Sequence, residues 1–385
     1  MIETWRWFGP DDSISLEKIA QAGASGIVTA LHHIPAGELW PLEAIEQRKA
    51  LIEGAGLEWT VIESIPVHND IKTRTGNYRQ HIENYKQSIA NAGKAGVKTI
   101  CYNFMPVVDW TRTNLSYQLP NKAYALRFEM TDFVAYDVFI LQRQNARSDY
   151  RPELIEQAKA RLDRMSPYEQ TQLEANIIAG LPGGEGSYDR EGIRLAIDEF
   201  IKLGNEGMRN NLFQFLEAVI PVAEQYGVKL CIHPDDPPFS LFGLPRVVST
   251  QDDARKLLQA VPSPSNGLTM CAGSYGARED NDLPGMVDEF ANRVYFVHLR
   301  NVIREPDGSF YESDHLNGDN DMVGLIKVLL DAERAHGIQI PMRPDHGHLL
   351  LDEAEKEGVK PGYSYMGRLK GLAELRGVIY ALKNL

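Results

Sequence analysis

The densest group of chemically active side chains in the sequence lies at residues 342–348, which read MRPDHGH. This stretch follows an apolar run, residues 337–341, whose pattern predicts a short buried strand. The strand therefore leads into an arginine, a carboxylate and two histidines. A packed core does not need that combination, because a buried charge costs several kcal/mol unless it is paired or bound to a metal. The stretch favours metal binding or proton transfer over a purely structural role.

Further apolar runs also end in residues that can bind metals. These are residues 228–232 before His233, residues 268–270 before Cys271, and residues 294–297 before His298. Taken singly, each could be a satisfied core side chain, and Cys271 could be a small buried apolar residue. Together with Asp345, they place four potential ligands at successive strand ends, which favours one shared divalent ion. A shell of His, Cys, His and Asp suits Mn²⁺, Fe²⁺, Zn²⁺ or Co²⁺ better than Mg²⁺ or Ca²⁺.

Short apolar runs alternate with helical patterns along most of the chain. The alternation predicts an α/β fold, a (β/α)8 TIM barrel, in which helices cover a closed parallel sheet. The active site of that fold lies at the C-terminal ends of the strands, where the unusual polar residues of this sequence occur. The predicted strands are residues 4–8, 26–31, 57–62, 97–103, 228–232, 268–270, 294–297 and 337–341.

The alternation pauses after the fourth predicted strand. Residues 108–203 hold helix-like segments, such as 148–165, and a glycine-rich loop at 180–186. This loop lacks the Lys-Ser/Thr pair of a phosphate-binding loop, so we expect a mobile lid rather than a nucleotide site. We therefore predict a single TIM-barrel domain over residues 1–385, with an insertion at 108–203 that is mainly helical.

The composition limits the classes of partner and the location. The 385 residues carry a formal net charge of −13, which disfavours a duplex-binding surface, because phosphate contacts need clustered Lys and Arg. The three cysteines show no disulfide pattern, and the N-terminus lacks the basic-then-apolar pattern of a signal peptide. No apolar run in the sequence approaches the ~20 residues of a spanning helix. We expect a cytoplasmic protein that contacts neither nucleic acid nor membrane.

Other polar residues near the strand ends are candidates for proton transfer and binding. His346 follows Asp345 and diverges from it, which suits acid or base chemistry beside the ion, or support of a ligand. Tyr363 lies on the loop after the eighth strand and could reach over the site or pack beside it. The candidates for holding a substrate are Arg6, Arg300 and Arg343, which could bind a carboxylate or pair with barrel acids, and His32 and His68.

Several long strings carry a resemblance to a known family. They are WRWFGP at 5–10, GIVTALHHIP at 26–35, ESIPVH at 63–68, CYNFMP at 101–106, HPDDPP at 233–238, FVHLR at 296–300 and RPDHG at 343–347. In these strings and in their order the chain resembles the mannonate dehydratase family, manganese- or iron-dependent enzymes of hexuronate breakdown. The resemblance runs nearly end to end and implies a barrel similar to that of xylose isomerases.

By this resemblance, the metal ligands fall on the four strand-end residues named above, and the catalytic pair falls on His346 and Tyr363. The implied reaction removes water from D-mannonate and gives 2-keto-3-deoxy-D-gluconate, with Mn²⁺ or Fe²⁺ as cofactor. The expected partners are this sugar acid and a second copy of the chain in a homodimer. Two other functions stay open at this point: a metal-dependent sugar isomerase or epimerase on the same barrel, and a non-catalytic sugar-acid-binding protein.

Overall fold

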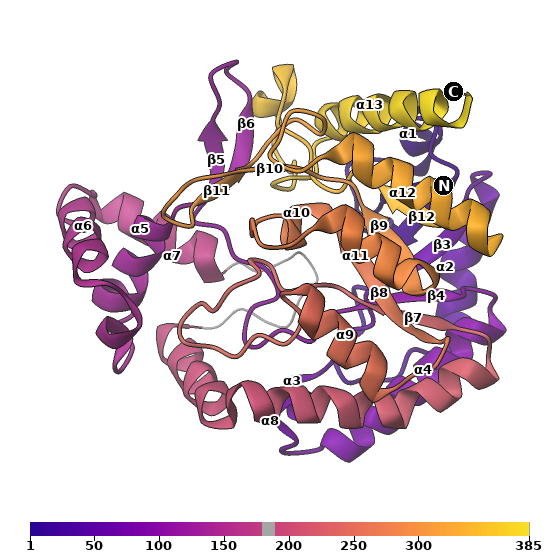
Figure 1. The fold of residues 1–385 in the computed structure, drawn as a ribbon, viewed down its shortest axis with the longest axis horizontal. Helices are drawn as coiled ribbons and strands as arrows, with labels where there is room; N and C mark the ends of the chain where they lie inside the picture. Colours follow the sequence, from indigo (N-terminus) through magenta and orange to yellow (C-terminus); the bar gives the residue numbers. More distant parts are fainter. Residues whose placement is uncertain (179–188, 385) are drawn as a thin grey trace.

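A closed barrel of parallel strands forms the centre of the molecule. The computed structural model describes residues 1–178 and 189–384. Its strands follow the closed order β1-β12-β9-β8-β7-β4-β3-β2, and helices surround them (Figure 1). The TIM-barrel prediction is therefore confirmed. The barrel strands are β1 (Ile2–Arg6), β2 (Gly26–Thr29), β3 (Glu58–Glu63), β4 (Thr99–Tyr102), β7 (Lys229–Ile232), β8 (Asn266–Cys271), β9 (Val294–His298) and β12 (Pro341–Arg343).

The last barrel strand begins later than the sequence predicted. The apolar run at 337–341 was expected to be the strand, but β12 covers Pro341–Arg343. Gly337 instead ends the preceding helix in the left-handed conformation, with φ of 61°, which glycine adopts without a steric penalty. The shift brings Arg343 into register with His298 of β9. The strand therefore delivers its arginine at the same level as a metal-ligand candidate.

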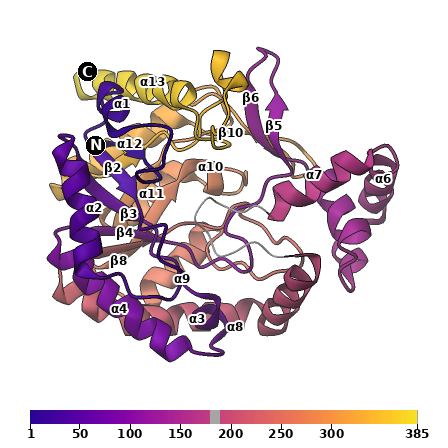
Figure 2. The ribbon, with the colours of Figure 1, turned by 180° about the vertical axis from the view of Figure 1, so that it is seen from behind.

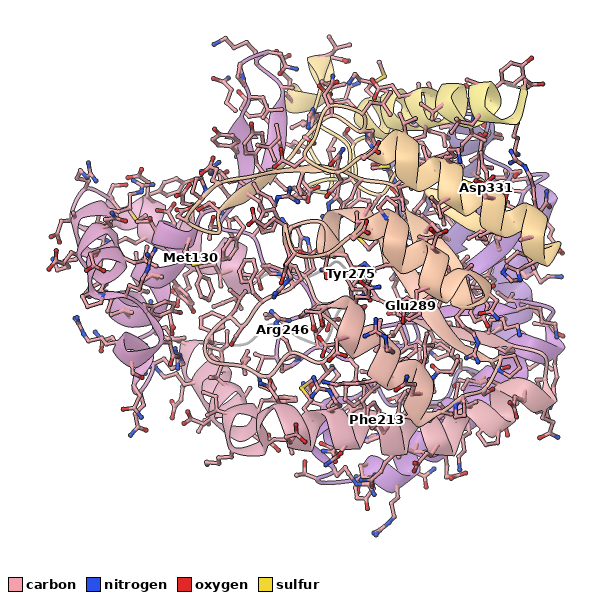
Figure 3. The ribbon with its side chains drawn as sticks, in the orientation of Figure 1. Met130, Phe213, Arg246, Tyr275, Glu289 and Asp331 are labelled. Atoms are coloured by element: carbon pink, nitrogen blue, oxygen red, sulfur yellow. The ribbon has the colours of Figure 1, made fainter. Side chains whose placement is uncertain are left out.

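Helices close the outside of the barrel (Figure 2). Several of these helices have a side-chain N-cap. For example, Thr250 and Asp253 form a reciprocal capping box at the start of the helix that follows Thr250. Figure 3 shows Glu289 and Asp331 on this outer layer, and Glu289 pairs with Arg255 of the neighbouring helix. The helices are α1 (Leu16–Gln21), α2 (Leu42–Gly54), α3 (Asn69–Thr73), α4 (Tyr78–Lys94), α8 (Arg190–Gln225), α9 (Gln251–Ala260), α10 (Ala272–Tyr275), α11 (Leu283–Phe290), α12 (Met322–His336) and α13 (Tyr365–Asn384).

The segment between β4 and β7 contains strands as well as helices. Helices were predicted for residues 108–203, and α5 (Met130–Ala135), α6 (Pro152–Leu162) and α7 (Pro167–Ile178) lie beside the barrel in Figure 1. The mainly helical prediction missed β5 (Asn114–Gln118) and β6 (Tyr124–Phe128). These strands join β10 (Val302–Arg304) and β11 (Phe310–Glu312) in an antiparallel sheet of order β10-β11-β6-β5. The glycine-rich loop at 180–186 lies outside the described residues.

The barrel interior is apolar below the strand ends. Its inner cluster contains only small and medium apolar groups apart from one phenylalanine, and all of them are buried: Val28, Val61, Cys101, Cys231 and Phe296. This layer closes the barrel from below, so polar side chains from the strand ends face one another above it. Within the described residues, no helix combines the length and the apolar character needed to cross a bilayer.

Candidate metal centre and active site

Three of the four predicted metal ligands converge at one point. His233 directly follows β7, Cys271 ends β8 and His298 ends β9, and these strands are neighbours in the barrel. Cys271 and His298 lie opposite each other in the β8–β9 register. One ligand atom from each of the three side chains lies within 4.8 Å of the others. The described residues therefore contain a group that could hold a metal ion.

The two imidazoles have the orientation of metal ligands. Nδ1 of His233 lies 2.7 Å from the carbonyl oxygen of Pro234. A carbonyl only accepts, so this nitrogen carries the ring proton and Nε2 keeps a free lone pair. Nε2 lies 3.2 Å from Nδ1 of His298. Two ligand atoms at bond lengths of ~2.1 Å from one tetrahedral ion are ~3.4 Å apart, so this spacing fits a shared cation.

The thiol of Cys271 is held in its ligand form. Its sulfur is fully buried and accepts a hydrogen bond from the Ser274 hydroxyl at 3.1 Å. Burial alone would raise the pKa of the thiol, but the positive charge of Arg300, together with the neighbouring imidazoles, holds this pKa well below its usual value. Metals bind the thiolate rather than the thiol, so the surroundings of Cys271 fit a metal ligand.

Asp345 completes the donor set from the loop after β12. Its Oδ2 lies 3.7 Å from Nδ1 of His298 and 4.0 Å from Sγ of Cys271. The residue has a φ of 60°, an uncommon conformation for a residue other than glycine. Its carboxylate also pairs with Arg343 and, at 2.9 Å, with Nε of Arg300. All four predicted ligands thus lie together, and a His, Cys, His, Asp donor set fits a divalent transition metal.

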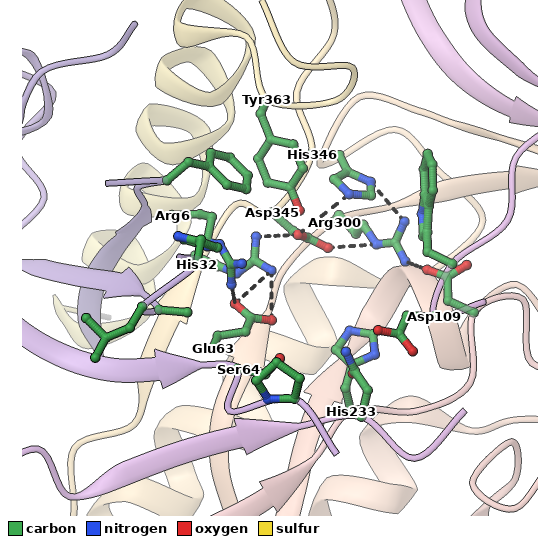
Figure 4. Close-up of a pocket in the computed structure, with 18 of the residues that line it drawn as sticks. Arg6, His32, Glu63, Ser64, Asp109, His233, Arg300, Asp345, His346 and Tyr363 are labelled. Carbon is green, nitrogen blue, oxygen red and sulfur yellow. Dashed lines mark hydrogen bonds and ion pairs between the residues drawn. The ribbon is translucent and has the colours of Figure 1, made fainter. Parts of the chain in front are cut away.

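A pocket opens directly beside these residues (Figure 4). Most of the residues predicted for binding and catalysis line it, and the aromatic side chains of Phe8, Trp40 and Trp110 form part of its wall. The predicted residues that line it are Arg6, His32, His233, Arg300, Arg343, Asp345, His346 and Tyr363.

His68 has a different environment from the one predicted. It is not among the described residues that line the pocket. Its ring stacks on His81, with centroids 4.2 Å apart, and its Nδ1 accepts the backbone N–H of Asp70 at 3.0 Å. The side chain thereby caps the start of α3. The expected contact of His68 with a substrate is therefore not supported by its position.

The two predicted catalytic side chains lie against each other. The rings of His346 and Tyr363 meet edge to face, with centroids 5.3 Å apart. Nδ1 of His346 lies 3.0 Å from Nη1 of Arg300 and 3.1 Å from Oε1 of Glu312. Burial raises the pKa of Tyr363, with Arg343 acting in the opposite direction, so the phenol stays protonated at neutral pH. The pair thus lines the same pocket as His233 and Asp345.

The three predicted carboxylate-binding arginines are already paired with acids. Arg300 contacts Asp236, Glu312 and Asp345, and it is almost completely buried. The other two arginines share one partner: Nη1 of Arg6 and Nη2 of Arg343 each lie 3.1 Å from Oε2 of Glu63. Of the two alternatives that the sequence left open, the structure therefore shows these arginines paired with acids of the protein.

His32 offers a neutral polar group to the pocket. Neither ring nitrogen has a hydrogen-bond partner among the described residues, although both atoms are buried. Burial, followed by the positive charges of Arg6 and Arg48, lowers the pKa of His32 to about 3. The imidazole is therefore uncharged at neutral pH and presents one donor and one acceptor, which suits contact with a hydroxyl group.

Four further residues belong to this site and were not predicted: Glu63, Arg112, Asp236 and Glu312. Glu63 ends β3, so the strand-end reasoning used for the later strands would have found it. Asp236 follows His233 closely, within the HPDDPP string at 233–238 that carries part of the family resemblance. Arg112 and Glu312 are different, because Glu312 lies on β11 of the unpredicted sheet and pairs with Arg112 at 2.8 Å. No local signal in the sequence indicates that contact.

Comparison with known proteins agrees with this geometry. The family model of D-mannonate dehydratase (UxuA) matches residues 1–385. The chain belongs to the D-mannonate dehydratase family. A mannonate dehydratase of Saccharophagus degradans is 72% identical over 100% of this chain and 98% of its own length. Mannonate dehydratase 2 of Agrobacterium fabrum is 58% identical, again over 100% of this chain and 98% of its own length.

A solved structure in the same family extends the agreement to three dimensions. The mannonate dehydratase of Streptococcus suis serotype 2 has a TM-score of 0.80 at 35% sequence identity, and the match covers 100% of this chain and 95% of that one. The resemblance inferred from the sequence strings is thus confirmed. As a member of the D-mannonate dehydratase family, the protein is a hydro-lyase.

Proposed function

We propose that the protein dehydrates D-mannonate to 2-keto-3-deoxy-D-gluconate at a metal centre formed by His233, Cys271, His298 and Asp345. The observation that carries this proposal is the convergence of His233, Cys271 and His298 within 4.8 Å beside a polar pocket, in a member of the D-mannonate dehydratase family. Mn²⁺ or Fe²⁺ is the proposed ion. The reaction belongs to hexuronate catabolism.

Two chemical barriers define what the site must supply. The C2 proton of the sugar acid is weakly acidic, because its neighbour is a carboxylate, and the C3 hydroxide is a poor leaving group. A bound divalent ion supplies electrostatic stabilisation of the negative charge that develops next to C2. One protein group must accept the C2 proton and another must donate a proton to the departing oxygen.

His346 and Tyr363 are positioned to share these two proton transfers. Both line the pocket, and their rings are in contact. The contact of His346 with Arg300 and Glu312 fixes the orientation of the imidazole. Trp110 and Phe8 pack against this pair, with ring centroids 6.0 Å from His346 and 4.9 Å from Tyr363, respectively.

The substrate carboxylate and hydroxyls need partners of their own. Arg6 is the proposed carboxylate contact, since among the described residues it pairs with one acid, Glu63, whereas Arg300 and Arg343 each pair with at least two acids. His32, neutral and with both ring nitrogens free, is proposed to bind a hydroxyl of the sugar chain. The homodimer, the cytoplasmic location and the lid at 180–186 stay predictions.

Incubation of the purified protein with D-mannonate and Mn²⁺ tests the function. A 2-keto-3-deoxy acid should form, and a thiobarbiturate assay detects it. Addition of a chelator in excess should stop product formation, and excess Mn²⁺ should restore it. An isomerase or epimerase would yield a product that keeps all the oxygens of the substrate, and a non-catalytic binder would bind mannonate without turnover. Either result would contradict the proposal.

Replacement of Tyr363 by phenylalanine tests the second proton-transfer group. The variant loses only the phenolic oxygen, so the ring still packs against Phe8 and His346. We expect kcat to fall by about 10²–10⁴-fold, the usual contribution of one general acid or base. Thermal unfolding of the variant checks that the fold is intact. A kcat within two-fold of the original protein would remove Tyr363 from the mechanism.

A further inference from the structure

Glu63 belongs to a strand on the opposite side of the barrel from His298, but its carboxylate comes close to the His298 ring. Glu63 ends β3 and His298 ends β9, and these two strands are separated by four steps in either direction around the closed order. The Glu63 side chain therefore spans the barrel mouth. Its Oε1 comes within 3.3 Å of Nε2 of His298, and both side chains are buried.

We propose that Glu63 is a positioning residue that orients His298 for metal binding and balances the charge around the ion. This inference rests on the metal centre proposed above. It assigns a function to a residue that ends the third barrel strand and is not a member of the His233, Cys271 and His298 group.

The approach of Glu63 determines which nitrogen of His298 carries the proton. Apart from the approach of Glu63, Nε2 has no hydrogen-bond partner among the described residues. A bare lone pair on Nε2 would face a carboxylate oxygen and repel it, whereas an N–H there is attracted by the charge. A neutral imidazole has one such proton, so Nδ1 is left bare. Nδ1 is the nitrogen that faces His233 and Asp345.

The two imidazoles each direct one ring nitrogen to an oxygen acceptor and the other ring nitrogen to each other. His233 directs its ring proton to the carbonyl oxygen of Pro234, so its bare Nε2 faces the bare Nδ1 of His298 at 3.2 Å. Two facing lone pairs repel each other unless a cation lies between them. Metal-binding histidines usually donate their other N–H to a carbonyl or a carboxylate. This site supplies one of each, from Pro234 and Glu63.

The carboxylate of Glu63 also compensates the positive charges of Arg6 and Arg343 beside the ligand group. Glu63 lies 3.1 Å from guanidinium nitrogens of both Arg6 and Arg343, and Arg343 also pairs with Asp345. Without this carboxylate, two buried positive charges would stand close to the bound cation with less compensation. Removal of Glu63 would therefore weaken metal binding through the ring orientation and through the charge.

Titration with Mn²⁺, followed by the EPR signal of the free ion, tests this proposal. For Glu63→Ala we expect a Kd for Mn²⁺ that is about 10–100-fold higher, the usual cost of losing the outer partner of a metal-binding histidine. Glu63→Gln should lose less, because its amide oxygen can still accept the N–H of His298. Glu333→Gln is the matched control: Glu333 is an equally buried carboxylate, but it binds the N-terminal amine and the Ile340 N–H. Its Kd should be unchanged.

The Co²⁺ derivative provides a readout that loss of stability alone would not change. At saturating Co²⁺, the visible absorption of the Glu63→Ala protein should differ from that of the unsubstituted protein, because a freed His298 ring changes the ligand geometry. The proposal is overturned if Glu63→Ala binds Mn²⁺ within two-fold of the original Kd and keeps its Co²⁺ spectrum. If the alanine variant does not fold, Glu63→Leu decides by the same criterion, because leucine fills a similar volume but cannot accept the N–H of His298.

The same titrations separate this inference from the metal centre itself. If Glu63→Ala binds normally while Cys271→Ser loses the ion, the role of Glu63 is wrong and the metal centre stands. If the unsubstituted protein binds less than one Mn²⁺ per chain, the metal centre is wrong and the role of Glu63 is wrong with it.

Discussion

Replacement of His346 by glutamine should lower kcat by about 10²–10⁴-fold, while the metal content stays at the level of the original protein. The side chain lines the pocket next to Tyr363 and approaches Asp345 only at 3.9 Å, through Nε2. It is therefore placed for proton transfer rather than for metal binding. A glutamine can keep a polar contact with Glu312, but it cannot exchange a proton at neutral pH.

The loss of turnover must be separated from a loss of the ion or of the fold. Metal analysis after dialysis and thermal unfolding of the variant make that separation. His33→Gln is a suitable control, because His33 is exposed, also follows a barrel strand, and is not among the described residues that line the pocket. Turnover within a few-fold of normal in His346→Gln would exclude His346 from the mechanism, and loss of the ion would make it part of the metal centre.

Replacement of Cys271 by serine should raise the Kd for Mn²⁺ by roughly 100-fold or more, since the loss of a ligand should cost at least as much as the loss of its outer partner. A serine hydroxyl stays protonated at neutral pH, so it does not replace the thiolate that Arg300 stabilises in Cys271. Activity at low Mn²⁺ should fall in parallel and recover partly at high Mn²⁺.

Another buried cysteine of the same barrel gives the matched control. Cys231 is not a member of the group of potential ligands. Its sulfur lies 3.5 Å from the carbonyl oxygen of Ile100, within the apolar inner cluster. Cys231→Ser should therefore retain the Kd for Mn²⁺, whatever its effect on stability. Metal content after dialysis that is equal in the Cys271→Ser, Cys231→Ser and original proteins would remove Cys271 from the ligand set.

The unpredicted sheet illustrates a limit of periodicity. Strand β5 pairs with β6, but the other partner of β6 is β11, which is distant in the sequence, and Phe128 stacks on Phe310 where these two strands pair. Local patterns show which face of a segment is apolar, but they do not show what will cover that face. Glu312 enters the site from this sheet, so its contact with His346 could not be predicted either.

The positions of the arginines show the same limit. Sequence reasoning left two possibilities for Arg300 and Arg343, a substrate carboxylate or a barrel acid. The choice depends on acids from other strands and loops: Glu63 from β3, Asp236 from the loop after β7, and Glu312 from β11. Those distances are set by closure of the barrel, and no spacing along the chain encodes them.

The sequence by itself determined the barrel, the family and the ligand candidates His233, Cys271, His298 and Asp345. It could do so because parallel strands of a barrel all present their C-terminal ends at one mouth, so the order of strands is enough to bring their last residues together. Only the tertiary structure decided how each group is protonated, paired and oriented. The proton on His298 and the commitment of the arginines depend on contacts across the barrel mouth, and electrostatic interactions follow distance in space rather than separation in the chain.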